Sequence, residues 1–264
     1  MKPLRVIPPA RTMAVSVVAV AVLAVGGFLV GQHLASTPQT GSSSPATSPG
    51  SPWSSTSAVT APKGWSVIAM VKHTIPRYPA PGTHPHGTVP ARWYGAVSAL
   101  PVISQRPGWY KVRLATRPDG STAWVRSADV TITSTPYRVV IDLATKHIKL
   151  LRAGKVVMDA PAGIGTVQDP TPAGQFFLAF FEQAPSPGYR PFIIVTSAHS
   201  TAIGDWDGSG DALIGIHGPL GSDDAIGSSG ARLSHGCIRL HAPDLLRLRD
   251  VPAGTPLTIT LTRP

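Results

Sequence analysis

Alternating apolar and polar positions predict a series of β-strands in the C-terminal half of the chain. In residues 137–143 (YRVVIDL), Val139, Ile141 and Leu143 fall on one face, because successive side chains of a strand point to opposite faces. Further β-type runs cover 147–151, 156–160, 192–198, 212–218, 236–240 and 256–262. Residues 243–251 (PDLLRLRDV) predict a helix, since they begin with proline and aspartate, which suit a first helical turn. We therefore expect a mostly-β fold.

A second group of short β-type runs lies between residues 65 and 134. These runs read WSVIAMV, GAVSALPVI, GWYKVRLA and TAWVRSADVTI, and turns such as PAPG and RPDGS separate them. Four or five short strands in a segment of this length predict a small β-barrel. The ending GWYKVRL…GSTAWVRSADV resembles bacterial SH3-like domains. We expect residues 65–134 to form such a domain, acting either as a spacer or as a wall-binding module.

The start of the chain predicts a membrane anchor. Residues 13–31 (MAVSVVAVAVLAVGGFLVG) have Ser16 as their only polar side chain, and about 20 apolar residues cross a bilayer as a helix. We expect a basic cytoplasmic tail at 1–11 and a transmembrane signal anchor at 12–31, because flanking basic residues favour the cytoplasm. A cleaved signal peptide is the alternative, and the lack of a nearby cysteine excludes a lipoprotein. The rest of the chain would lie outside the cell membrane.

Composition predicts a disordered linker after the anchor, and the distribution of charge predicts an anionic partner. Residues 32–64 predict a disordered linker, since 36–62 contain nine Ser, five Thr, five Pro and two Gly and no charged residue. Residues 1–118 carry eleven Lys or Arg and no acidic residue, whereas 119–264 carry twelve basic and thirteen acidic residues. No basic helix or nucleic-acid motif accompanies the positive charge. An anionic cell-wall polymer or membrane face is therefore the expected partner.

Cys237 is the only cysteine of the chain, and its neighbours predict chemistry rather than packing. In LSHGCIRL it is surrounded by polar, small and basic residues, namely Ser234, His235, Gly236 and Arg239. Such an environment lowers the pKa of a thiol and favours a nucleophilic thiolate. A single cysteine in an exported domain also has no partner for an intramolecular disulfide.

A second histidine-containing turn, IGIHGP, ends another predicted strand and contains His217 and Gly218. A cysteine nucleophile needs a base within hydrogen-bonding reach and a group that orients this base. The residue before a proline favours extended geometry, and a Gly218 carbonyl held in this way could orient the His217 ring. Gly236 lets backbone amides approach a substrate carbonyl closely, as an oxyanion hole requires.

Together these motifs resemble the signature of the L,D-transpeptidases, whose catalytic domain is of the YkuD type. The resemblance covers residues 137–263 and includes His217, Gly218 and the segment Ser-His-Gly-Cys-Ile-Arg. The segment DPTPAGQFFL (169–178) is also similar to a family segment. The resemblance to anchored actinobacterial members implies a β-sandwich catalytic domain that acts on peptidoglycan stem peptides. It implies 3→3 cross-links formed through a cysteinyl acyl-enzyme, with release of D-Ala from a tetrapeptide donor.

The same resemblance implies roles for individual residues. Cys237 is the nucleophile, His217 the proton donor and acceptor, and Gly218 orients His217 through its carbonyl. His235 and Gly236 form the oxyanion hole with the Cys237 amide. Ser234 and Arg239 bind substrate, Arg239 through a carboxylate, for which its planar guanidinium is suited. No cofactor and no metal are expected.

Three alternatives remain open from the sequence, and a fourth, a calcium loop, is not supported. An L,D-carboxypeptidase would share the acyl-enzyme and use water as acceptor, and a non-catalytic wall-binding adaptor would share the folds. A zinc site would draw on His217, His235 and Cys237, together with His241 or His199, although its spacing is unusual for zinc. Residues 205–216 (DWDGSGDALIGI) imitate a calcium loop but lack the final glutamate, so a turn is predicted there.

Overall fold

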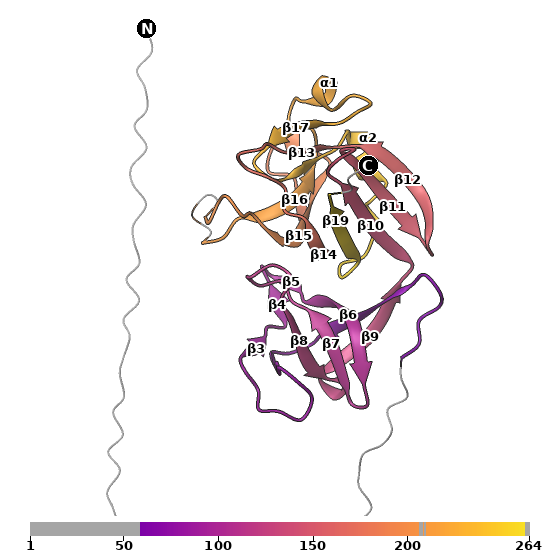
Figure 1. Cartoon of the computed structure of the whole chain (residues 1–264), viewed down its shortest axis with the longest axis vertical. Coiled ribbons are helices and arrows are strands. Elements are labelled where there is room, and N and C mark those ends of the chain that lie inside the picture. Colours follow the sequence, from indigo (N-terminus) through magenta and orange to yellow (C-terminus); the bar gives the residue numbers. More distant parts are fainter. Residues whose placement is uncertain (1–58, 206–207, 209, 262–264) are drawn as a thin grey trace, which may run out of the picture. The chain divides into compact units, whose positions relative to one another are not determined.

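The computed structural model describes residues 59–205, 208 and 210–261. The predicted cytoplasmic tail, the membrane anchor and most of the linker lie outside the described residues. No helix within the described ranges is long and apolar enough to cross a membrane. Two larger β-sheets dominate this part of the chain (Figure 1), which confirms the prediction of a mostly-β fold.

The N-terminal sheet is antiparallel and has five strands in the order β8-β7-β6-β1-β9. Its strands are β1 (Ser66–Val71), β6 (Ala99–Arg106), β7 (Trp109–Arg113), β8 (Thr122–Arg126) and β9 (Val130–Thr135). Two short strand pairs accompany it, β2 (Ile75–Pro76) with β3 (Thr88–Val89), and β4 (Arg92–Trp93) with β5 (Ala96–Val97). This sheet agrees with a small β-domain, and its assignment as SH3-like stays a prediction.

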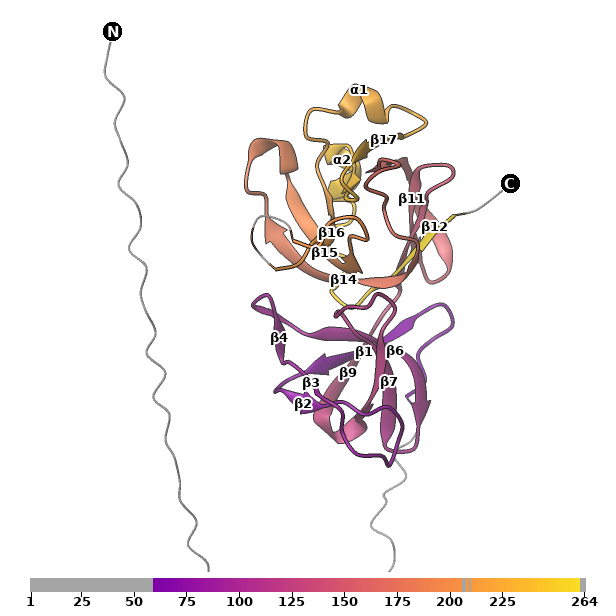
Figure 2. The same ribbon diagram turned by 60° about the vertical axis from the view of Figure 1, so that its left-hand side comes forward.

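The C-terminal sheet has ten strands in the order β12-β11-β10-β19-β14-β15-β16-β18-β13-β17. The strands are β10 (Tyr137–Asp142), β11 (His147–Arg152), β12 (Lys155–Pro161), β13 (Gly163–Gly165), β14 (Gly174–Gln183), β15 (Phe192–His199), β16 (Leu213–His217), β17 (Ala231–Ser234), β18 (Ile238–Arg239) and β19 (Pro256–Thr260). Strands β14, β15 and β16 lie side by side (Figure 2). Their shared face carries the site described below.

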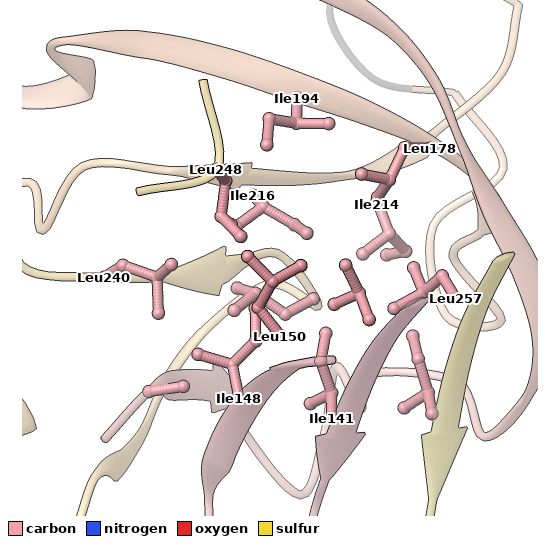
Figure 3. Close-up of a cluster of buried hydrophobic side chains, with 14 of the residues drawn as sticks. Ile141, Ile148, Leu150, Leu178, Ile194, Ile214, Ile216, Leu240, Leu248 and Leu257 are labelled. Carbon is pink, nitrogen blue, oxygen red and sulfur yellow. The ribbon is translucent and has the colours of Figure 1, made fainter. Parts of the chain in front are cut away.

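The alternating apolar positions predicted in 137–143 form part of the hydrophobic core of this sheet. Val139 and Ile141 are fully buried, and they pack with isoleucines and leucines of β11, β14, β15, β16 and β19 (Figure 3). The predicted helix at 243–251 is shorter than expected, since α2 spans Ala242–Leu246 and turns follow it. A second short helix, α1 (Asp223–Ile226), was not predicted. It lies in the segment between the two histidine-containing turns.

Buried side chains of the N-terminal and C-terminal sheets share one hydrophobic cluster. Phe177, Phe180 and Val195 of the C-terminal sheet pack with residues of β1, β6, β7 and β8. The register of β14 shifts between Leu178 and Phe180, where a β-bulge changes which side chains face each side. The two buried hydrophobic clusters of the described residues therefore do not coincide with the two sheets, because one of the clusters includes residues of both.

Polar contacts join the same two regions. His199 is 1% exposed, and its Nδ1 lies 2.6 Å from a carboxylate oxygen of Asp119 in the β7–β8 connection. Arg117 of that connection forms an ion pair with Asp211 at 2.9 Å and donates to the Ser200 carbonyl at 3.1 Å. These side chains have structural partners, so His199 belongs to the contact between the two sheets.

Candidate active site

One face of four neighbouring strands forms the floor of a cavity of about 400 Å³. Most of the lining comes from alternate positions of β14, β15, β16 and β18, together with Cys237 and with Ile214, which also borders the cavity. The alternate positions include Phe180, Glu182, Ile193, Val195, Leu213, Gly215, His217 and Arg239. The residues between them, such as Ile194 and Ile216, point to the opposite face and into the core (Figure 3). The two-residue period of the strands therefore separates the chemical face from the packing face.

Cys237 lies directly before β18 and faces the strand that carries His217. Strands β16 and β18 are parallel and pair Ile216 with Ile238 and His217 with Arg239. The same register places Gly215 beside Cys237, and the Gly215 amide donates a hydrogen bond to the sulfur at 3.4 Å. Because side chains of adjacent parallel strands at paired positions share a face, Cys237, His217 and Arg239 lie on one surface. The sequence analysis did not identify Gly215, whose role depends on this pairing.

Burial raises the pKa of the Cys237 thiol above its ordinary value. The hydrogen bond from Gly215 and the charge of Arg239 act in the opposite direction, and burial is the larger effect. The expectation of a resting thiolate is therefore wrong. Of its basic neighbours in sequence, Arg239 only partly offsets burial, and the His235 ring pairs with Asp169 and is 64% exposed. The sulfur lies close to the backbone of β16, one of the strands that form the floor of the cavity.

The His217 ring is held in a defined orientation and a defined protonation state. Its Nδ1 lies 2.7 Å from the Gly218 carbonyl oxygen, which can only accept, so Nδ1 carries the proton and Nε2 is left as the basic nitrogen. Burial lowers the pKa of His217 to about 4, and the charge of Arg239 adds to this effect. At neutral pH the imidazole is therefore uncharged and able to accept a proton.

Gly218 and residues 188–190, which precede β15, pack closely around His217. A Cβ at Gly218 would lie 2.2 Å from the Arg190 carbonyl oxygen and 2.8 Å from that of Gly188. The Gly218 amide donates to the Tyr189 carbonyl at 3.2 Å, and the Tyr189 ring lies 4.7 Å from the His217 ring. Only glycine fits this close approach, and Tyr189 covers the imidazole.

We expect Gly218→Ala to displace this segment, because the new methyl group meets backbone atoms that cannot rotate away. The free energy of unfolding should fall by about 1–3 kcal/mol, and turnover should fall at least tenfold as the imidazole loses its orientation. Urea denaturation and turnover measurements test both effects. Gly204→Ala is the matched control, since a Cβ there meets nothing within 4 Å. Equal behaviour of the two variants would contradict this role of Gly218.

The turn that carries Cys237 is held by hydroxyl groups. The Ser234 hydroxyl donates to the Cys237 carbonyl at 2.5 Å and accepts from the Gly236 amide at 3.2 Å. Thr171, from the segment 169–178, donates to the Gly236 carbonyl at 2.7 Å. Gly236 has φ +112, and a Cβ there would lie 2.8 Å from the Ile214 side chain, so this position requires glycine. Ser234 thus shapes the turn, and its role in substrate binding stays a prediction.

His235 does not share an extended face with Cys237, because residues 235 and 236 form a bend. The His235 Nδ1 lies 2.5 Å from a carboxylate oxygen of Asp169, and His235 still lines the cavity. Asp169 therefore joins the predicted residues as the partner of this ring. The resemblance of segment 169–178 was the only sequence signal that pointed to Asp169 and Thr171.

Arg239 contributes a half-buried positive group to the cavity. Its Nη1 donates to the Ser222 hydroxyl at 3.0 Å, whereas its Nε is buried with no hydrogen-bond partner among the described residues. A buried donor of this kind is stabilised by an anionic acceptor. This geometry agrees with the predicted contact to a substrate carboxylate.

The residues of the alternative zinc site are not arranged as ligands. Among the described residues, no group of three or more His, Cys, Asp or Glu side chains could hold a metal ion. His241 lies 3.2 Å from Asp223, and His199 contacts Asp119. Hydrogen-bond partners thus account for both of the additional histidines.

The site and the strand order define a mostly-β catalytic domain with a cysteine and a histidine on one face. Residues 136–259 match the sequence profile of the L,D-transpeptidase catalytic domain named YkuD. The chain thus carries a YkuD-type L,D-transpeptidase catalytic domain in its C-terminal half.

Several curated relatives carry the name L,D-transpeptidase, among them two Bacillus proteins. YkuD of Bacillus licheniformis is 32% identical over 126 residues, which is 47% of this chain and 66% of the relative. YqjB of Bacillus subtilis is 29% identical over 132 residues, which is 47% of this chain and 71% of the relative. The chain therefore spans just under two thirds of the Bacillus licheniformis protein.

Solved structures show weaker similarity. An L,D-transpeptidase from Mycobacterium smegmatis has a TM-score of 0.38 and 18% identity, and covers 58% of this chain and 90% of its own. An LD transpeptidase in complex with imipenem has the same TM-score and 19% identity, and covers 74% of this chain and 82% of its own. The domain assignment rests on the sequence profile and the curated relatives.

Proposed function

We propose that this chain is a peptidoglycan L,D-transpeptidase that forms 3→3 cross-links through an acyl-enzyme on Cys237. The observation that carries the proposal is the shared face of Cys237 and His217 on the cavity floor, with Nδ1 of His217 held by the Gly218 carbonyl. A neutral thiol beside a neutral imidazole is a suitable resting state, since proton transfer then accompanies attack.

In the acylation step, His217 Nε2 takes the thiol proton while the Cys237 sulfur attacks the carbonyl between the third stem residue and D-Ala. The backbone amides of Cys237 and Gly236 would stabilise the oxyanion. The Gly236 amide donates a hydrogen bond to the Ser234 hydroxyl, so it would have to break this bond or share its proton with the oxyanion. His217 returns the proton to the amine of D-Ala, the C–N bond breaks, and a thioester remains.

In the second step, the side-chain amine of a neighbouring stem attacks the thioester. His217 accepts a proton from this amine and returns it to the departing sulfur, so the thiol is restored and an amide replaces the amide that was cleaved. The reaction needs no external energy source, because one amide is exchanged for another. Arg239 would bind the carboxylate of the donor's D-Ala through its buried Nε, a charge-assisted contact.

Product analysis tests this proposal. The full-length protein is incubated with a disaccharide-tetrapeptide, and the products are identified by mass. A dimer that has lost one D-Ala and carries the 3→3 linkage is expected. Tripeptide without dimer would identify an L,D-carboxypeptidase, and the absence of both products would favour a non-catalytic adaptor.

We also propose that the chain is anchored in the cell membrane by one helix at 12–31, with residues 65–134 binding an anionic wall polymer. Several basic side chains of this region are exposed, among them Lys72, Arg92, Arg106 and Arg126, against two acidic residues, Asp119 and Asp129. An exposed basic surface attracts a polyanion over about one Debye length, roughly 10 Å at 0.1 M salt.

Binding to isolated cell walls should therefore decrease steeply as salt is added. Sedimentation of the full-length protein with purified walls at increasing sodium chloride measures this dependence. Cys237→Ala is the control, and it should bind like the wild type, because the binding surface lies outside the catalytic cavity. Salt-insensitive binding, or no binding, would leave residues 65–134 as a spacer.

A further inference from the structure

The N-terminal region contributes one side chain to the catalytic cavity. Tyr94 lies in the turn between β4 and β5, is 52% exposed, and lines the same cavity as Cys237 and His217. Its ring stacks on Phe180 of the cavity floor, with ring centroids 6.0 Å apart and an angle of 26° between the planes. The wall of the cavity above β14 is thus built from a distant part of the sequence.

The aromatic contacts of Tyr94 hold it in this position. Trp93 lies edge-on to Tyr94 at 5.1 Å and edge-on to Phe180 at 5.6 Å. Arg92 donates from Nη1 to the Gly95 carbonyl at 2.8 Å across the same turn. Aromatic pairs at these separations are stabilising beyond the area they bury. The Tyr94 ring is therefore a fixed feature of the cavity, with half of its surface still available.

The turn itself does not explain the choice of tyrosine. Tyr94 has φ +48 and Gly95 has φ +81, and positive values at both central residues are what a type I′ hairpin turn requires. Asn-Gly is strongly preferred there, and a bulky residue at positive φ is unfavourable. A side chain kept in such a conformation at a site indicates a functional role more than a structural one.

The strand order places Tyr94 far from the reacting sulfur. Its partner Phe180 lies on β14, whereas Cys237 and Arg239 lie at β18, and two strands separate them. Three strand spacings amount to about 14 Å. If Arg239 binds the D-Ala carboxylate, the donor runs from β18 toward β14. The four stem residues, counted from this D-Ala, cover about 13–14 Å when extended, so the sugar-bearing end reaches the Tyr94 ring.

We propose that Tyr94 is a positioning residue that binds the sugar-bearing end of the donor stem; this rests on the proposed function. The flat face of a sugar ring carries C–H groups that pack on an aromatic face, and the exposed half of the Tyr94 ring offers one. The N-terminal region then determines specificity as well as attachment: it distinguishes stems that carry sugar from free peptides.

The test compares two donors, a disaccharide-tetrapeptide and the free tetrapeptide, with the full-length protein. Tyr94→Asn removes the ring contacts with Trp93 and Phe180 but introduces the residue that the turn prefers, so these two effects oppose each other and its resistance to urea should stay close to that of the wild type. We expect KM for the disaccharide donor to rise about three- to tenfold, with kcat nearly unchanged. KM for the free tetrapeptide should change less than twofold. Tyr94→Phe should behave like the wild type, because it keeps the ring.

Val97→Thr serves as the matched control, since Val97 is exposed on the same hairpin and does not line the cavity. An unchanged KM for the disaccharide donor in Tyr94→Asn, or an equal rise for both donors, overturns the assignment while leaving the proposed function intact. A wild-type protein that turns over neither donor overturns the proposed function and this inference with it.

Discussion

Replacing Cys237 with alanine is expected to abolish covalent labelling by a carbapenem and to reduce turnover at least about a thousandfold. A carbapenem contains a strained amide that the sulfur can open, leaving the drug attached as a thioester. Intact-mass measurement of the full-length protein after incubation should show one added drug in the wild type and none in the variant.

The fold of this variant needs its own measurement. Alanine removes the acceptor of the Gly215 amide, so we expect a loss of about 1 kcal/mol in the free energy of unfolding. A urea titration measures this loss, and a small change shows that the missing label reflects the missing sulfur. Labelling that persists in Cys237→Ala would place the nucleophile elsewhere in the chain.

Replacing His217 with glutamine is expected to reduce turnover by about a hundred- to ten thousandfold, the usual contribution of a positioned general base. Glutamine keeps a donor near the Gly218 carbonyl but cannot take the thiol proton. The same variant should change how stability depends on pH. Burial holds the pKa of His217 at about 4 in the folded chain, against 6.5 for the unperturbed side chain.

The sign of this pH effect follows from proton binding. Between pH 6.5 and about 4 the unfolded chain binds a proton at this histidine and the folded chain does not. Acidification therefore favours unfolding, and His217 lowers the free energy of unfolding by about 3 kcal/mol between pH 7 and pH 4. His217→Gln lacks this contribution, so its stability should fall less over that range than that of the wild type.

Urea titrations at pH 7 and pH 4 measure the difference between the two proteins. His235→Gln is the control, since it removes a neighbouring imidazole that is exposed and paired with Asp169. If His235→Gln rather than His217→Gln removes the pH dependence and most of the turnover, the roles of the two histidines are reversed.

Several features of this protein could be predicted from local sequence alone. Alternation in 137–143 predicted a buried strand face, and Val139 and Ile141 are fully buried. The motifs around His217 and Cys237 predicted that these residues act together, and the structure places both on the floor of one cavity. Such features depend on the two-residue period of a strand and on glycines at close approaches, both of which the sequence shows directly.

Other features depend on contacts between distant parts of the chain. The pKa of Cys237 is raised rather than lowered because burial against the sheet outweighs its neighbours in sequence. The Gly215 amide reaches the sulfur only through the pairing of β16 with β18. Tyr94 reaches the cavity through its contact with Phe180, 86 positions away. Burial and strand pairing are properties of the whole fold, so only the tertiary structure decided the electrostatics and the outer wall of this site.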